Sequence, residues 1–295
     1  MTVNSFADRL LRDTRTGVCV GLTDIALIYP LAVLATRREN GLTLRNALAQ
    51  RRLHSGGLTA GTLLVPYSVL VETMSQQLQA MQASSDRDGR QLQMLGAAAA
   101  TSLIASIGVQ PIEKKLVMDQ MLESSKVDSV ENSTHRGANS LTRGNPLLQP
   151  LKQILAYRRE HGTRALYAGF TPLLGREFIY IAAITAVNPT VSSWAIGNGT
   201  ARDDNFALFR GGLAAFSVGC TAGVLSAPCQ TLNAMMKTER YRCSSVTTIV
   251  RGMFAQGWTS GIHRLYFGAM TRSVRCGGAG VLYFGYRRIN GSVDD

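Results

Sequence analysis

Five charged residues of this chain stand in or beside long stretches that otherwise carry no charge: Asp24, Arg176, Glu177, Arg272 and Arg275. Charged groups inside a membrane are costly, so they usually mark a function or an internal ion pair. An arginine can hold a carboxylate through two parallel hydrogen bonds, and a glutamate can bind an ammonium group. One interpretation of these residue types is recognition of a small charged or zwitterionic solute. In the alternative, Arg176 and Glu177, or Arg275 and Asp24, simply neutralise each other in a sealed interior.

The chain shows no pattern typical of an enzyme. It has no glycine-rich phosphate loop and no nucleophile paired with a base. Its five cysteines form no C-x-x-C or Cys/His pattern with metal spacing. The histidines are scattered: His54, His135, His161 and His263. We therefore expect no catalytic residue, no metal site and no cofactor.

The charge balance is strongly basic, with 31 Lys and Arg against 19 Asp and Glu and a formal net charge of +12. The basic residues lie mainly in segments between the apolar stretches, such as RRENGLTLRNALAQRR. No segment resembles an RNA-binding or DNA-reading motif, so we do not expect a nucleic-acid partner. Basic loops beside apolar spans are typical of contact with an anionic lipid such as cardiolipin in the bilayer.

Six stretches carry almost no charge, and several are shorter than the roughly 20 residues that cross a bilayer. Core helices of a soluble protein are one interpretation. Small residues four positions apart, in GVCVG at Gly17 and GCTAG at Gly219, favour closely packed membrane helices instead. We therefore predict an all-α membrane protein. The stretches are residues 17–35, 58–71, 94–110, 178–196, 211–236 and 276–286.

Amphipathic segments connect the members of each pair of spans. Residues 42–52, 150–162 and 246–257 combine apolar and charged positions in a pattern typical of short helices at a membrane surface. Residues 122–145 are rich in Ser, Asn and charge, which predicts a polar solvent loop.

A proline and then a glycine signature recur three times along the chain. The prolines are Pro30, Pro111 and Pro228, and the signatures SGG, ALYAGFTP and RLYFGAMT follow them. Such spaced recurrence predicts one structural unit used three times. We place the repeats at residues 1–95, 96–208 and 209–295.

With these repeats in view, the chain resembles the mitochondrial carrier family over nearly its whole length. The resemblance rests on GVCVGLTDIALIYPLAVLATR, HGTRALYAGFTPLLGREF and SGIHRLYFGAMTRSVRCGGAGVLYFGY. It implies six transmembrane helices in three pseudo-threefold repeats with short surface helices, in the mitochondrial inner membrane. Each proline is expected to kink an odd-numbered helix, because it cannot donate an amide proton.

Carriers join their odd helices by salt bridges within Pro-x-[Asp/Glu]-x-x-[Lys/Arg] motifs, and this chain departs from that pattern. Of the six charged positions only Glu113 remains charged, as a residual gate; the third copy has Gln230 and Asn233 instead. The second set of charges, on the even helices, is also expected to be absent. The resemblance places the substrate contacts at Leu63, Arg176 with Glu177, and Arg275.

Two functions remain open from the sequence. The loss of both sets of charges leads us to expect a carrier-fold structural or accessory subunit of a larger inner-membrane assembly, with protein partners and little or no transport. Arg176, Glu177 and Arg275 favour the alternative, an active transporter of a small charged or zwitterionic, amino-acid-like metabolite.

Overall fold

The computed structural model describes residues 3–28, 30, 33–34, 65–74, 87–128, 149–197, 205–237 and 244–289. Within these residues all regular structure is helical and there is no strand. The predicted all-α class is therefore confirmed for the described part of the chain. The number of six spans and the threefold repetition stay predictions.

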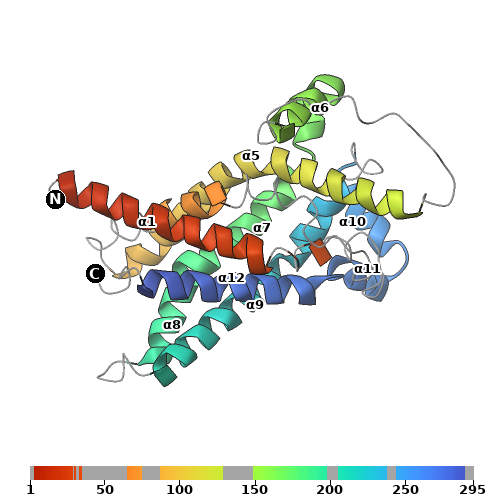
Figure 1. The fold of residues 1–295 in the computed structure, drawn as a ribbon. Coiled ribbons are helices and arrows are strands. Elements are labelled where there is room, and N and C mark those ends of the chain that lie inside the picture. Colours follow the sequence, from red (N-terminus) through yellow and green to blue (C-terminus); the bar gives the residue numbers. More distant parts are fainter. Residues whose placement is uncertain are drawn as a thin grey trace.

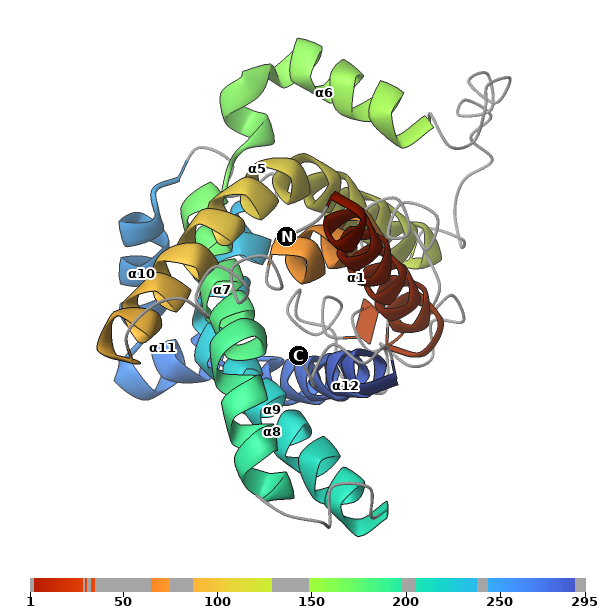
Figure 2. The ribbon, with the colours of Figure 1, turned by 90° about the vertical axis from the view of Figure 1, so that its left-hand side faces the viewer.

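The long helices pack side by side around a common centre (Figure 1 and Figure 2). Contacts connect α1 to α12, α12 to α9, α9 to α7, and α7 to α5. The helical segment 65–74 lies inside this arrangement against α1 and α7. The long elements are α1 (Val3–Thr23) with the π-helix η1 (Asp24–Ile28), α5 (Arg87–Asp128), α7 (Phe170–Ala182) continued by η2 (Ala183–Val187) and α8 (Asn188–Ile196), α9 (Asn205–Lys237) and α12 (Ala269–Ile289).

Three helices of the described part are long and apolar enough to cross a membrane: Met94–Lys115, Phe170–Ile196 and Phe206–Lys237. They coincide with the third, fourth and fifth predicted spans. The last predicted span falls in α12, whose arginines at 272, 275, 287 and 288 make it more polar.

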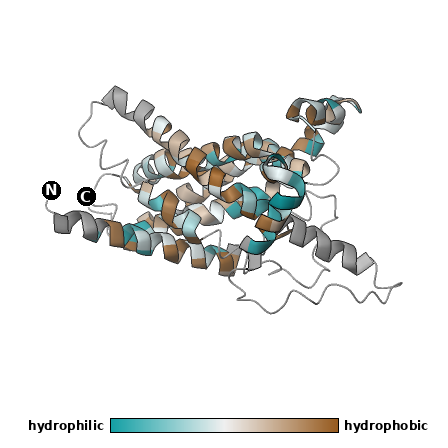
Figure 3. Ribbon diagram, turned by 90° about the horizontal axis from the view of Figure 1, so that it is seen from above, coloured by the Kyte–Doolittle hydropathy of each residue, from teal (hydrophilic) through white to brown (hydrophobic). Residues whose placement is uncertain are grey.

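Helix α5 turns polar side chains inward and large apolar side chains outward. Along α5, Ser102, Ser106 and Gln110 are completely buried, whereas Ile104 and Ile107 are each 50% exposed. Polar positions four residues apart lie on one face of a helix, so α5 has a polar inner stripe. Figure 3 shows apolar and polar residues mixed along the bundle helices. This arrangement is the reverse of a soluble bundle and suits helices with an apolar surrounding and a polar interior.

Glycines allow α9 and α12 to approach closely. A β-carbon added at Gly223 would lie 2.6 Å from the backbone Cα of Ser273, and one at Gly280 would lie 2.6 Å from the carbonyl oxygen of Ala215. A β-carbon at Gly17 would lie 2.5 Å from Val69 Cα, so α1 and the segment 65–74 are equally close. Both small-residue patterns of the sequence therefore mark helix contacts, as predicted.

Pro111 and Pro228 lie inside α5 and α9, and both helices continue beyond them. A proline has no amide proton, so the carbonyl four residues earlier loses its helical donor. In α5 this carbonyl belongs to Ile107, and the hydroxyl of Tyr167 donates to it at 3.3 Å. Pro30 is helical, but residues beside it lie outside the described part. The kinks expected at the three prolines stay predictions.

Two of the three glycine signatures form the same turn. Gly169 and Gly268 both have φ of 85°, in the left-handed region that favours glycine. In each turn the amide after the glycine donates to a tyrosine carbonyl, at 3.1 Å from Tyr167 and 3.0 Å from Tyr266. Each turn leads directly into a long helix, α7 or α12. The third signature, at Gly56, lies outside the described residues.

The short helices are α6 (Gln149–Leu166), α10 (Val246–Phe254) and α11 (Trp258–Leu265). Helices α6 and α10 occupy two of the predicted surface segments; the third, residues 42–52, lies outside the described part. The expected repeat boundaries, 95/96 and 208/209, fall inside α5 and α9, and the division into repeats stays a prediction. The polar loop is predicted from residue 122, but α5 continues to Asp128. The serines and the lysine in these last helical residues have adequate helix propensity.

Candidate binding site

A polar cavity of about 80 Å³ lies in the centre of the bundle. Its wall includes three acidic and three basic side chains together with tyrosines, drawn from α1, η1, the segment 65–74, α5, α7 and α12. The charged members are Asp24, Glu113, Glu177, Arg176, Arg272 and Arg275. All charged residues predicted in apolar surroundings therefore meet at one cavity, and their formal charges balance.

Arg176 is the centre of a buried group of polar contacts. Its Nε donates to Glu177 Oε1 at 2.7 Å, and its Nη1 lies 2.6 Å from Glu113 Oε1 and donates to Gln230 Oε1 at 2.6 Å. The second oxygen of Glu177 accepts a hydrogen bond from the hydroxyl of Tyr67. Arg176 and Glu177 thus neutralise each other, and their polar atoms already have protein partners.

Glu113 also joins α5 to α9. Its Oε2 accepts from Lys237 Nζ in an ion pair and from Asn233 Nδ2 at 3.2 Å. Glu113 is the predicted residual gate charge, and Asn233 occupies the basic position of the third copy. In the structure Lys237, four residues further on the same face of α9, supplies the cation. We call Glu113, Arg176, Glu177 and Lys237 the α5–α7–α9 ion cluster.

A second ion pair joins helices at the opposite end of the bundle. The Arg287 guanidinium of α12 holds the Glu72 carboxylate with hydrogen bonds of 2.8–3.1 Å, and both side chains are buried. The pair lies near the end of α12 beside the chain termini, whereas Lys237 ends α9 near α10 (Figure 1). This pair does not reproduce the family's second set of charges, whose expected absence stays a prediction. An acid and a base are present, but the arginine occupies the expected acidic position.

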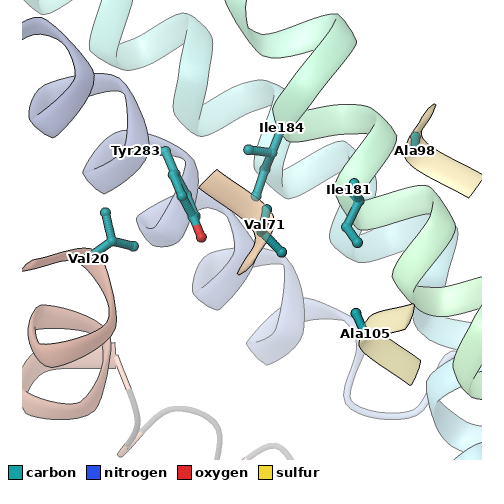
Figure 4. Close-up of a cluster of buried hydrophobic side chains, with 7 residues drawn as sticks. All are labelled: Val20, Val71, Ala98, Ala105, Ile181, Ile184 and Tyr283. Atoms are coloured by element: carbon teal, nitrogen blue, oxygen red, sulfur yellow. The ribbon is translucent and has the colours of Figure 1, made fainter. Parts of the chain in front are cut away.

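Apolar side chains separate the cavity from the Glu72–Arg287 pair. Val20 and Tyr283 belong both to the cavity wall and to a buried cluster with Val71, Ile181 and others (Figure 4). The carbonyl of Ile184, another member of this cluster, accepts a 3.4 Å hydrogen bond from Arg287 Nη1. An apolar cluster and an ion pair therefore adjoin the cavity on this side.

Asp24 and Arg275 form a looser pair across the cavity. Arg275 Nη2 lies 3.8 Å from Asp24 Oδ2, which is too far for a direct hydrogen bond. Asp24 begins the π-helix η1, a local widening that is frequent at functional sites. Arg272 lies one turn before Arg275 on the same side of α12 and donates to Ser226 Oγ at 3.1 Å.

The remaining site predictions have mixed outcomes. Leu63 lies outside the described residues. Asp24, Arg176, Glu177, Arg272 and Arg275 are brought together, and Glu113 joins them. Sequence reasoning missed Lys237, Glu72 and Arg287 as ion-pair partners; the helical spacing between Asn233 and Lys237 is the signal that could have identified the first. Within the described residues, no three His, Cys, Asp or Glu side chains form a group that could hold a metal ion.

No protein-family model matches the chain, and no curated protein matches it.

Proposed function

We propose that this protein is a membrane transporter of the mitochondrial carrier type, which moves a small charged or zwitterionic metabolite across the mitochondrial inner membrane. The observation that carries the proposal is the central cavity, where six charged side chains with balanced charge line a space about 80 Å³ in volume. Buried charges are costly, and a bundle built only for support has no need to group six of them around a cavity.

The inter-helix ion pairs support transport over a purely structural role. An accessory role is favoured by the loss of the two sets of salt-bridge residues that close a carrier at its two ends. The α5–α7–α9 ion cluster and the Glu72–Arg287 pair provide such links with different residues. The cluster borders the cavity and extends to Lys237 at the end of α9, and the Glu72–Arg287 pair lies near the end of α12. A transporter needs two closures that break in turn, because its ligand must favour different states at different steps.

The direct test is uptake by the purified full-length protein reconstituted in liposomes. Amino acids, carboxylic acids and amines should be supplied in turn as labelled solutes. We expect saturable uptake of at least one class of solute. Lys237→Met and Glu72→Gln should alter this uptake. Arg158→Gln should leave it unchanged, because Arg158 is exposed on α6. Uptake no faster than in protein-free liposomes for all three classes would contradict the proposal.

One observation favours the second candidate, an accessory subunit. Helix α8 and the start of α9 extend away from the other helices (Figure 2) and expose Trp194, Phe206 and Phe209, each at least 63% accessible. Large exposed aromatic residues suit a protein contact, although they also suit the aromatic belt of a membrane interface. If this role is correct, the protein migrates in a large complex on native gels and Trp194→Ala releases it; migration as a lone monomer contradicts the role.

A further inference from the structure

We propose that Asp24 binds the cationic group of the transported solute and Arg275 binds its anionic group, so that the substrate is an amino acid or a similar zwitterion. This inference rests on the proposed function. Of the contacts that the family resemblance implies, Leu63, Arg176 with Glu177, and Arg275, it keeps Arg275 and replaces Arg176 and Glu177 with Asp24 of η1.

Asp24 has a carboxylate oxygen that lacks a partner. The residue is 8% exposed and lines the cavity, and its Oδ1 makes no hydrogen bond to any described residue. A buried polar atom without a hydrogen bond costs free energy, and a charged one costs more. An ammonium group in the cavity would remove this cost, since it can donate three hydrogen bonds.

Among the described residues, Arg275 is held only by a loose ion pair. Its only ion contact within the described residues is the 3.8 Å approach to Asp24, and its side chain keeps 29% exposure although it lies inside the bundle. A guanidinium has five N–H donors in a planar fork that fits a carboxylate. Arg275 therefore offers the anion site that balances Asp24.

Arg176 and Glu177 do not offer such sites. The guanidinium of Arg176 already contacts Glu113, Glu177 and Gln230, and Glu177 also accepts from Tyr67. A solute could bind there only by breaking short buried contacts. The same residues instead fix the positions of α5, α7 and α9 around the cavity.

The spacing of the free pair suits a zwitterion. In an amino acid the ammonium and the carboxylate are attached to one carbon, so they can lie against two opposite charges that are close but not bonded. Asp24, the ammonium, the carboxylate and Arg275 then form a ring of alternating charge. At roughly 10–15 Å³ for each water, the cavity has room for several waters or for a solute with a similar number of heavy atoms.

The test measures binding and uptake separately, with the purified full chain. The probes are the proteinogenic amino acids, each compared with the carboxylic acid that lacks its amine and the amine that lacks its carboxylate. Binding is read from the rise in unfolding temperature in detergent, and transport from uptake in liposomes. The variants are Asp24→Asn, the charge-balanced double variant D24N/R275Q, and Asp8→Asn as the control, because Asp8 is an exposed acid on α1, the helix that η1 continues.

We expect an amino acid to stabilise the wild type and Asp8→Asn more than either analogue does. Loss of one charge-assisted hydrogen bond should weaken this binding at least about tenfold in Asp24→Asn, while binding of the carboxylate-only analogue is kept. Without solute, D24N/R275Q should unfold at the same temperature as the wild type. It should bind neither the amino acid nor the carboxylate-only analogue.

Equal amino-acid affinity in the wild type and Asp24→Asn would overturn the inference, as would preference of the wild type for a solute without an amine. Saturable uptake of such a solute would still support the proposed transport. Conversely, amino-acid binding that depends on Asp24 without any uptake would support the site and contradict transport.

Discussion

At the scale of single residues, the interior of this protein contains two kinds of charge. Arg176, Glu113 and Lys237 form short contacts that span three helices, whereas Asp24 and Arg275 are 3.8 Å apart and Asp24 Oδ1 has no hydrogen-bond partner among the described residues. Buried ion pairs with complete hydrogen bonding fix a geometry, and incompletely paired ones are available to a ligand. The two kinds of charge therefore divide between support and recognition.

This division predicts unequal effects within the α5–α7–α9 ion cluster. Glu113→Gln leaves two cations without this acid, so we expect a loss of about 3–5 kcal/mol in the free energy of unfolding. Lys237→Met should cost less, because Glu113 keeps Arg176 as its partner. Unfolding in detergent, followed by circular dichroism, measures both, and Arg158→Gln is the exposed control.

Equal stability of Glu113→Gln and the wild type would show that the cluster does not hold the three helices together. A larger loss for Lys237→Met than for Glu113→Gln would reverse the assigned order of the two residues.

At the scale of elements, the contact between α9 and α12 depends on the absence of side chains. The backbone of Ser273 occupies the position that a β-carbon at Gly223 would need, at 2.6 Å. Small residues let membrane helices pack through van der Waals contact, which must replace the hydrophobic effect there. Helix α12 carries the arginines that face the cavity, so its distance from α9 decides where these arginines lie.

A matched pair of substitutions in α9 tests this contact. Gly223→Ala should reduce stability by about 1–3 kcal/mol, because the added methyl group meets backbone that cannot yield without moving α12. Gly212→Ala, on the same helix with nothing within 4 Å of the new methyl group, should be neutral or stabilise by up to about 1 kcal/mol.

The unfolding temperatures of the two purified variants give the comparison. If they agree, the close approach of α9 and α12 does not limit stability.

At the scale of the whole molecule, the apolar outer face distinguishes a membrane bundle from a soluble one. Ile104 lies near the middle of the span Met94–Lys115 and is 50% exposed on its outer side. In lipid, a lysine at the centre of a span costs roughly 2.5–3.5 kcal/mol for insertion. An exposed position in water usually tolerates the same change within about 0.5 kcal/mol.

Ile104→Lys should therefore reduce membrane insertion by at least about tenfold, measured as the fraction that resists extraction by alkaline carbonate. Leu155→Lys is the control, because Leu155 is also exposed but lies on the short helix α6. Full insertion of Ile104→Lys would place this face of α5 away from lipid.

The sequence by itself determined the features that depend on local patterns. Charge-poor stretches indicated long helices, Gly219 and Gly223 indicated a close helix contact, and the lone charges indicated a polar interior. Helix length, side-chain size and charge are properties of neighbouring residues, so the sequence alone reveals them.

Only the tertiary structure decided which charges pair. Glu113 and Lys237 are 124 positions apart, and Glu72 and Arg287 are 215 positions apart. Their pairing depends on how the helices rotate and slide against one another. On α9 the cation that pairs with Glu113 is Lys237, one helical turn beyond the neutral Asn233. The same packing satisfies Arg176 and Glu177 and leaves Asp24 Oδ1 without a partner among the described residues. The sequence therefore identified the charged residues, but the packing of the helices decided which of them hold the bundle together and which remain available to a solute.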